Sequence, residues 1–476
     1  MLLLKPDVPR PSQSRIERAR IELHRRLGAS KVLDAVESCE RFGADESEAQ
    51  GETPDAVVLA ETKQDILHTL AVARETGVPV TPRAGGTGRT GGAVPVAGGI
   101  VLALSGMNQI LEIDVAEGLA VVQPGVVLGD FHAAVEAEGA FYPPDPNSLT
   151  GCCLGGNVAE NAGGPRAFKY GVTRDYVLGV EAFLMGGQQI QCGRRTKKGV
   201  TGYDVTGLLV GSEGTLAVLG DITLRLISKP THVMTLMVLL SDLDVAAALV
   251  ARATASGLTP RCIEILDGGT LEAIREAGNP INPAAQAMLL IDVDGDEPAC
   301  EAQAERLAGL SDDLGALELL VAQDAAQRDR LWNARREMSP AVRRMARNKL
   351  SEDVVVPRQA MGELLRRVAR TSEQEQIRTV TYGHAGDGNL HVNFLWNDPE
   401  ELPRVDRAIE RLFRDVLELR GTLSGEHGIG VLKAPYLHLE QSGELIQLQQ
   451  DLKRVFDPAG LLNPGKIFPT QGHGAC

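Results

Sequence analysis

Residues 155–164 read Gly-Gly-Asn-Val-Ala-Glu-Asn-Ala-Gly-Gly, and they follow the segment Pro143-Pro144-Asp145-Pro146-Asn147-Ser148. Glycine has no Cβ, so backbone built from it can approach a ligand closely, while Asn and Ser supply hydrogen-bonding groups. A second glycine-rich stretch lies earlier, between Pro82 and Gly92. Nine of the chain's 52 glycines lie in these two short stretches. The two stretches together predict a site where backbone surrounds a bound molecule.

The earlier stretch contains Gly86-Thr87-Gly88-Arg89-Thr90-Gly91, which satisfies the G-x-G-x-x-G pattern after a predicted strand. A Rossmann site requires a helix to begin at that point, so that the helix N-terminus meets the pyrophosphate. Here Gly92, Pro95, Gly98 and Gly99 follow, and this composition does not hold a helix. The loop still predicts phosphate binding, because consecutive glycines let backbone N–H groups converge on an anion. A plain hairpin loop is the alternative for this segment taken alone.

Three further motifs continue the pattern along the chain: residues 203–208 (YDVTGL), 211–216 (GSEGTL) and 463–466 (NPGK). With the two glycine-rich stretches, they resemble the FAD-linked oxidase family, also called the vanillyl-alcohol oxidase superfamily. The resemblance covers nearly the whole chain past residue 50. It implies an α+β fold, with a two-subdomain FAD-binding domain of the vanillyl-alcohol oxidase type and an α+β, ferredoxin-like substrate cap domain.

The resemblance also suggests how the chain is divided. Lys229-Pro230 marks a boundary, after which predicted strands and helices alternate. We expect an N-terminal helical segment (1–50), the FAD-binding domain (51–228), the cap (229–425) and a C-terminal segment that returns to the flavin (426–476).

The family resemblance implies which residues contact FAD. Some relatives tether the flavin through a His in the first loop, but Thr87 stands near that place here, so non-covalent FAD is expected. The expected contacts are Arg83, Ala84, Gly85, Gly86, Thr87, Gly88 and Gly92 at the pyrophosphate; Pro144, Asp145, Ser148, Gly156, Asn157, Asn161, Gly163 and Gly164 along the flavin; Glu213, Gly214 and Val218 on the adenosine side; and Asn463 from the C-terminal segment.

A histidine-rich motif, His-Ala-Gly-Asp-Gly-Asn-Leu-His-Val-Asn, occupies residues 384–393. Polar and apolar residues alternate from residue 390, so His391 and Asn393 are expected on one face of a strand, with His384 before a glycine turn. Glu426, in the later Ser-Gly-Glu-His-Gly segment, could complete a two-His, one-carboxylate set suited to Zn, Mn or Fe. In extended backbone the adjacent His427 would point away from Glu426. The alternatives are satisfied structural histidines and a glycine-rich turn that carries two surface polar residues.

These motifs resemble the D-2-hydroxy-acid dehydrogenase branch of the family, which includes D-lactate and D-2-hydroxyglutarate dehydrogenases and the FAD subunit of glycolate oxidase. The resemblance implies that His384, His391 and Glu426 bind Zn or Mn, and that His427 takes the substrate hydroxyl proton while hydride passes to FAD. Arg335, at the family's distance from Trp332, would bind the substrate carboxylate, assisted by Lys349 and Asn393. Its helix is rich in Arg, most of which must face water, and this is the alternative for Arg335.

Composition restricts the remaining possibilities. The net charge of −15 argues against a nucleic-acid partner, and the seven scattered cysteines are typical of free thiols in a reducing compartment. The longest apolar run, residues 233–240, is far shorter than the roughly 20 residues of a membrane span. We therefore expect a cytoplasmic protein without a transmembrane segment.

Several questions stay open on the sequence alone. The electron acceptor is expected to be a quinone, an electron-transfer flavoprotein or an iron–sulfur subunit, and a homodimer is possible. The particular D-2-hydroxy acid is not determined. The competing functions are a different flavin alcohol oxidase, a non-catalytic flavin-binding subunit and a metal-dependent hydrolase, of which the last leaves both glycine loops unexplained.

Overall fold

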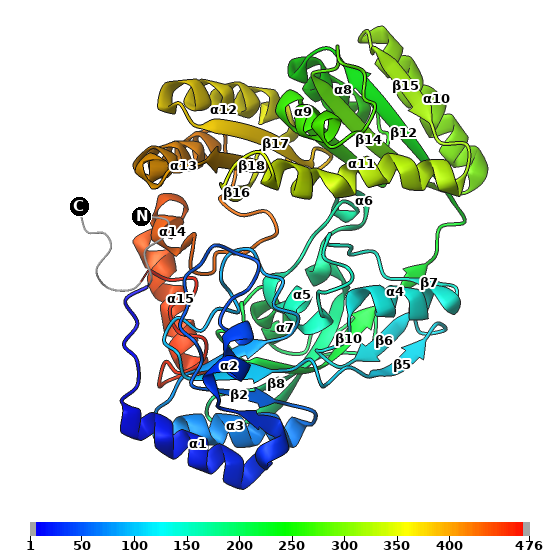
Figure 1. Ribbon diagram of the computed structural model, residues 1–476. Coiled ribbons are helices and arrows are strands. Elements are labelled where there is room, and N and C mark those ends of the chain that lie inside the picture. The colour runs from blue at the N-terminus through cyan, green and yellow to red at the C-terminus, as the bar shows by residue number, and fades with distance from the viewer. Residues whose placement is uncertain (1–5, 470–476) are drawn as a thin grey trace.

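The computed structural model describes residues 6–469, and its strands form a lower part and an upper part that face each other (Figure 1). The lower part is built from two sheets that lie side by side, and the upper part from one larger sheet with helices on it. The chain crosses to the upper part after residue 228 and returns after residue 423. The two glycine-rich stretches and the histidine motif therefore come from opposite parts.

The first sheet of the lower part has the strand order β1-β2-β4-β3, in which β2 and β3 both run parallel to β4. Helix α3 begins at a capping box, where Thr62 and Asp65 bond each other's backbone, and it packs with α1. The sequence predicts a helical N-terminal segment, but the segment is not helical throughout. Val32 and Leu33 form an edge strand that pairs antiparallel with β2. The elements are α1 (Gln13–Leu27), β1 (Val32–Leu33), α2 (Val36–Cys39), β2 (Ala56–Leu59), α3 (Lys63–Thr76), β3 (Val80–Arg83) and β4 (Ile100–Ala103).

The second sheet of the lower part is antiparallel and has the order β5-β6-β10-β8-β9, beside a small β7-β11 pair. Strands β8 and β9 form a hairpin, and Gly186 and Gly187 lie in the turn between them. The elements are β5 (Ile110–Asp114), β6 (Leu119–Val122), α4 (Leu128–Ala137), β7 (Ala140–Phe141), α5 (Leu154–Glu160), α6 (Ala167–Tyr170), β8 (Val177–Phe183), β9 (Gln189–Gly193), α7 (Val205–Leu209), β10 (Val218–Arg225) and β11 (Ile227–Ser228).

The two glycine-rich stretches fold differently. Residues 84–99 contain no helix, as predicted from their composition. In the second stretch, residues 154–160 do form the short helix α5, because Leu154 and Val158 on one of its faces are buried in the core of the second sheet. The helix ends at Asn161, which adopts a left-handed conformation with φ of 56°. Only the rest of this stretch is loop.

The upper part is a seven-stranded antiparallel sheet with the order β15-β12-β14-β13-β17-β18-β16. Its first four strands in sequence have the order 4-1-3-2 with helices α8 and α10 between them, which is the ferredoxin-like arrangement expected for the cap. The elements are β12 (His232–Leu240), α8 (Leu243–Ala255), β13 (Cys262–Asp267), α9 (Gly268–Glu276), β14 (Ala287–Gly295), α10 (Glu297–Asp313), β15 (Glu318–Val321), α11 (Ala325–Arg343), β16 (Asn348–Val355), α12 (Met361–Glu375), β17 (Arg378–His384), β18 (Asn389–Trp396) and α13 (Leu402–Glu418).

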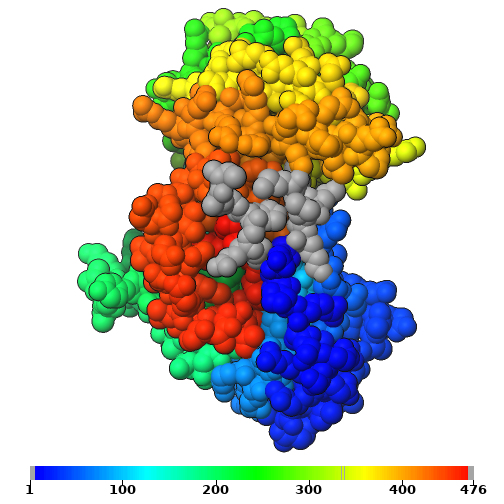
Figure 2. Space-filling view, turned by 90° about the vertical axis from the view of Figure 1, so that its left-hand side faces the viewer, coloured from blue at the N-terminus to red at the C-terminus, as the bar shows by residue number. Residues whose placement is uncertain are grey.

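The C-terminal segment, with helices α14 (Leu437–Glu440) and α15 (Gly443–Phe456), comes back to the lower part. Leu462 forms a parallel bridge with Val80 of β3, and the Lys466 ammonium donates to the Val94 carbonyl oxygen at 2.7 Å. Figure 2 shows this segment beside the N-terminal residues, under the cap. The chain end thus closes over the loop that follows β3. Among residues 6–469 no helix is long and apolar enough to cross a membrane.

Candidate active site

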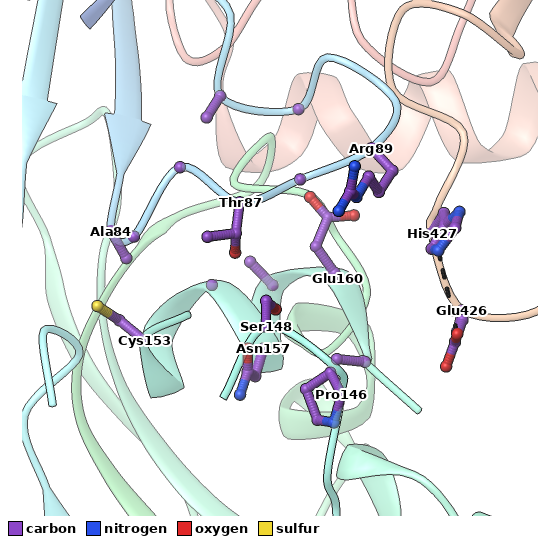
Figure 3. A pocket seen from close by; sticks show the side chains of 18 of the residues that line it. Ala84, Thr87, Arg89, Pro146, Ser148, Cys153, Asn157, Glu160, Glu426 and His427 are labelled. Atoms are coloured by element: carbon purple, nitrogen blue, oxygen red, sulfur yellow. Dashed lines mark ion pairs between the residues drawn. The ribbon is translucent and has the colours of Figure 1, made fainter. Parts of the chain in front are cut away.

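A long cavity runs from the first glycine loop to the underside of the cap, so residues from all parts of the chain line it. Figure 3 shows Thr87, Ser148 and Glu160 between the loop and α5, with Glu426 and His427 projecting from the C-terminal loop. The predicted site residues that line the cavity are Arg83, Ala84, Gly85, Gly86, Thr87, Gly88, Gly92, Ser148, Gly156, Asn157, Gly163, Glu213, Gly214, Arg335, Lys349, His391, Glu426 and His427.

The first loop has unused hydrogen-bonding capacity. Among the described residues, no protein atom accepts a hydrogen bond from the backbone N–H groups of residues 85–88. The buried Asn157 Nδ2 atom also has no hydrogen-bond partner there. Unpaired N–H groups in a glycine loop suit an anion such as a pyrophosphate. The residues present therefore fit FAD with its phosphates at this loop.

An acidic side chain, Glu160, also lines the cavity beside the loop. Burial raises the pKa of Glu160 well above its usual value, and the nearby charge of Glu213 raises it further. A neutral carboxyl group does not repel a phosphate. Glu213 itself accepts hydrogen bonds from the Ile429 and Gly430 backbone N–H groups at 2.8 and 2.7 Å, so it fastens the C-terminal loop to the lower part.

Eight predicted site residues do not line the cavity: Pro144, Asp145, Asn161, Gly164, Val218, His384, Asn393 and Asn463. Several of them support the residues that do. Asp145 pairs with Arg166 at 3.0 Å, and the Asn463 amide nitrogen donates to the Gly92 and Glu213 carbonyl oxygens at 2.9 and 2.8 Å. Asn393 is fully buried, and its amide is engaged by Tyr382 and by backbone oxygens. The structure thus does not bring Asn393 to the cavity.

The three predicted metal ligands do come together. His384 ends β17, His391 lies on the adjacent β18, and Glu426 reaches them from the C-terminal loop. The Glu426 Oε1 atom lies 3.2 Å from His384 Nε2 and 3.6 Å from His391 Nε2. One ligand atom from each residue lies within 4.8 Å of the other two. Two imidazoles and one carboxylate at this spacing fit a divalent cation.

Asp353, on β16, organises the C-terminal loop. Its Oδ2 atom accepts three consecutive backbone N–H groups, from Gly425, Glu426 and His427, at 2.8, 2.9 and 3.0 Å. The loop is therefore curled around one oxygen instead of extended. The expectation that His427 points away from Glu426 is wrong for this reason, since His427 Nε2 lies 4.0 Å from Glu426 Oε1.

The curled loop also stacks two imidazole rings. The His427 and His391 rings are 5.2 Å apart and nearly parallel, with an interplanar angle of 11°. His391, His427 and Asp353 form a second group of metal-ligand type. Because Asn389 occupies the Asp353 Oδ1 atom at 2.6 Å and the loop occupies Oδ2, we assign Asp353 to orienting the loop.

The electrostatics of the cluster follow from burial and charge. Burial by itself lowers the pKa of His384, but the charges of Glu264 and Glu426 outweigh it and raise this pKa well above its usual value. Burial, and then the charge of His427, lower the pKa of His391 to about 3. Burial also lowers the pKa of His427. His391 and His427 are thus held neutral, as a ligand and a proton acceptor need to be. The two carboxylates favour the protonated form of His384, so a cation would bind there with release of the Nε2 proton.

Arg335 lies on the Arg-rich helix α11 but does not face water, since only 4% of its surface is exposed. Its Nε atom donates to Glu264 Oε2 at 2.6 Å, while Nη2 has no protein partner. Its guanidinium carbon lies 5.7 Å from the centre of the Tyr382 ring. The Lys349 ammonium lies 3.4 Å from the Tyr382 hydroxyl oxygen. Two cations and a phenol therefore line the cap end of the cavity, where they suit an anionic ligand.

Sequence reasoning missed Glu264, Asp353, Tyr382 and Glu160. Glu264 carries a recognisable signal, since it is the one charged residue within the apolar run Cys-Ile-Glu-Ile-Leu at 262–266. An acid inside a strand that is buried on both faces must have a partner. The other three have no such signal, because their roles arise from segments distant in sequence.

The Gly85→Ala substitution is expected to abolish or strongly weaken FAD binding. A Cβ at this position would lie 2.3 Å from the Gly151 carbonyl oxygen and 3.1 Å from the Cys152 Cα atom, so the two glycine-rich segments would have to separate. The measurement is the flavin absorbance per protein after purification. Gly309→Ala, in helix α10 where nothing lies within 4 Å of a Cβ, is the control for glycine replacement as such. A Gly85→Ala protein with a full complement of bound flavin would contradict the cradle.

A glycine cradle for a dinucleotide beneath a cap that supplies imidazoles, a carboxylate and an arginine defines a cofactor-dependent enzyme of the flavoprotein class. Sequence comparison agrees with this class. Residues 54–193 match the model of an FAD binding domain, and residues 229–467 match the model of the C-terminal domain of FAD linked oxidases. The chain belongs to the FAD-linked oxidase family.

Curated relatives cover most of the chain. It is 40% identical over 418 residues to a glycolate oxidase subunit GlcD of Bacillus subtilis, covering 87% of this chain and 89% of the relative. It is 33% identical over 459 residues to a D-lactate dehydrogenase of Anaerostipes hadrus, covering 94% and 96%. These relatives place the chain in the 2-hydroxy-acid branch of the family.

Solved structures share the fold at low identity. A substrate-bound p-cresol methylhydroxylase has a TM-score of 0.81 at 16% identity and covers 98% of this chain and 99% of its own. The 4-ethylphenol oxidase of Gulosibacter chungangensis has a TM-score of 0.80 at 19% identity, with the same coverage. The vanillyl-alcohol oxidase-type fold predicted from the sequence is confirmed.

Proposed function

We propose that this protein oxidises a D-2-hydroxy acid to the 2-oxo acid. The observation that carries the proposal is that one cavity connects the glycine loop to the cluster of His391, Glu426, His427 and Arg335. The names of the curated relatives, glycolate oxidase subunit and D-lactate dehydrogenase, support this substrate class. FAD, when bound, supplies the acceptor for the hydride.

The cap residues would bind the carboxylate of the substrate. Arg335 presents Nη2 without a protein partner, and a guanidinium group can bind a carboxylate through two parallel hydrogen bonds. Lys349 adds a second positive charge beside Tyr382, with its ammonium 3.4 Å from the Tyr382 hydroxyl oxygen. The carboxylate of the acid would thus be held at the cap, with its hydroxyl group toward His427.

His427 would accept the hydroxyl proton. Its pKa is lowered by burial, so the ring is neutral at neutral pH, and its Nδ1 atom has no hydrogen-bond partner among the described residues. Stacking on His391 and the hydrogen bond from its backbone N–H to Asp353 fix the ring in place. A fixed, neutral imidazole is a competent general base.

His384, His391 and Glu426 would hold a divalent cation, Zn or Mn. Such a cation would act as a Lewis acid toward substrate oxygens. On its other side His384 donates its Nδ1–H to Glu264 Oε1, as ligating imidazoles usually do toward a carboxylate. Electrons would leave the protein to a quinone, an electron-transfer flavoprotein or an iron–sulfur subunit, and the subunit name of the B. subtilis relative supports a protein partner.

The test is anaerobic mixing of the purified protein with D-lactate, D-2-hydroxyglutarate, glycolate and L-lactate, while flavin absorbance is followed. We expect bleaching by a D-acid or by glycolate, its loss after EDTA treatment, and its recovery with Zn or Mn. Bleaching that survives EDTA would contradict the cation, and a flavin that no hydroxy acid bleaches would contradict the proposed function. Preferential bleaching by glycolate would favour the second candidate, an FAD subunit of a glycolate oxidase, to which the 40% identity points.

A further inference from the structure

Glu264 lies in the middle of β13, near the centre of the cap sheet, and none of it is exposed. Its neighbours Ile263 and Ile265 are part of the hydrophobic core of the cap. An ionised carboxylate in such surroundings is costly unless both of its oxygens are paired. The position therefore requires specific partners for this side chain.

Each oxygen of Glu264 has a different partner. Oε1 lies 2.5 Å from His384 Nδ1, and Oε2 accepts from Arg335 Nε at 2.6 Å. The pairing of β13 with β17 sets Glu264 directly opposite His384, while Arg335 approaches from α11. Among the described residues, Glu264 is thus the single side chain that is hydrogen-bonded to both His384 and Arg335.

The contact between Glu264 and His384 determines which ring nitrogen of His384 faces the cation site. Because Nδ1 is held by Glu264, Nε2 is directed at Glu426 Oε1, 3.2 Å away. A carboxylate behind a ligating imidazole fixes the orientation and the tautomer of the ring.

The contact with Arg335 has the matching effect on the anion side. Glu264 occupies the Nε edge of the guanidinium group, which leaves Nη2 unpaired at the cavity. The guanidinium carbon also lies over the ring of Tyr382, 5.7 Å from its centre, and this packing further restricts the orientation of the Arg335 side chain. Arg335 is thereby held in one orientation before a carboxylate arrives.

We propose that Glu264 is a positioning residue that couples the two sites, so that binding of a divalent cation at His384 and binding of a carboxylate at Arg335 strengthen each other. The inference rests on the proposed function for the identity of the two ligands. A ligand that fixes either His384 or Arg335 also fixes Glu264, because each oxygen of Glu264 is bonded to one of them. The other side chain is then already ordered when its own ligand arrives. Such coupling is reciprocal, so each ligand raises the affinity for the other by the same factor.

The test uses the Glu264→Gln variant of the full-length FAD-containing protein. Two dissociation constants are measured: that of Mn²⁺ for EDTA-treated protein, and that of pyruvate and glyoxylate, followed by the change in the flavin spectrum, with and without Mn²⁺. We expect the Mn²⁺ dissociation constant to rise about 10- to 100-fold, the range for partners of metal ligands. We also expect weaker binding of the 2-oxo acids in the metal-free protein, and a smaller effect of Mn²⁺ on their binding.

The control variant is Asp267→Asn. Asp267 is a carboxylate on the same strand whose Oδ2 atom accepts from the Thr381 backbone N–H of β17 at 2.6 Å, but it contacts neither His384 nor Arg335. The Asp267→Asn substitution should lower the melting temperature and leave the dissociation constants of Mn²⁺ and of the 2-oxo acids unchanged. If Glu264→Gln does not yield folded flavoprotein, Glu264→Asp gives the same test, since a side chain shorter by one methylene cannot reach both partners.

A folded Glu264 variant with wild-type constants for both ligands overturns the proposal. So does a variant with a weakened Mn²⁺ constant but unchanged binding of 2-oxo acids in the metal-free state, because Glu264 would then serve the cation site alone. The proposed function fails separately, in the wild-type protein, if Mn²⁺ does not bind or if neither 2-oxo acid perturbs the flavin.

Discussion

Replacing His427 by Gln is expected to slow reduction of the flavin by the substrate about 10²- to 10⁴-fold, the contribution typical of a general base. His427 lines the cavity beside Glu426, and burial keeps its imidazole neutral. Gln keeps a polar side chain at this position but does not take up a proton. Stopped-flow measurement of flavin bleaching under anaerobic conditions gives the rate constant directly.

FAD and the cation should remain bound in this variant, because the Asp353 contacts to the loop come from backbone N–H groups that any side chain retains. His438→Gln is the matched control, since His438 is exposed on α14 and, within residues 6–469, bonds only the Pro435 carbonyl oxygen. A His427→Gln protein with normal flavin content and an unchanged bleaching rate would exclude His427 as the base.

Replacing Arg335 by Lys is expected to lower kcat/KM by roughly 10- to 150-fold, which corresponds to the loss of about 1.5–3 kcal/mol for one hydrogen bond to a charged group. Lys keeps the positive charge that Glu264 needs, but it does not offer the planar fork that binds a carboxylate through two hydrogen bonds. Most of the loss should appear in KM, because the carboxylate is bound equally before and during the reaction.

Arg336→Lys is the control for this prediction. Arg336 is the next residue on α11 but is exposed and bonds Asn333 and the Asp329 carbonyl oxygen. It should leave kcat/KM within twofold of wild type, as expected for a surface substitution. Equal effects of the two substitutions would show that Arg335 does not bind the substrate.

Much of the fold could be predicted because its signals are local. The capping box at Thr62 and Asp65, the alternation from Leu390 to Phe394 and the glycine turn between β8 and β9 each depend on a few neighbouring residues. The same holds for the rejection of a Rossmann site, since the residues after Gly91 cannot continue as a helix. The second glycine stretch was harder, because burial of Leu154 and Val158 outweighs the helix-breaking tendency of its glycines.

The candidate site was predicted unevenly for the same reason. His384 and His391 share a β-hairpin, so their proximity follows from one motif, and Glu426 joined them by resemblance. Whether Arg335 faces water or the cavity could not be read from its helix, since that helix carries five Arg residues. The answer came from Glu264, a partner 71 positions away in sequence.

The sequence by itself determined the family, the glycine cradle and the residue types available for chemistry, because these are properties of short contiguous stretches. Only the tertiary structure decided that Asp353 curls the loop of His427 toward Glu426 and that Asn393 is hydrogen-bonded to Tyr382 instead of lining the cavity. It also decided that Glu264 is hydrogen-bonded to both His384 and Arg335. Each of these is a contact between side chains or backbone groups from separate strands and loops. Their geometry is set by how sheets and helices pack, and a buried charge takes whatever partner the packing brings within hydrogen-bonding distance.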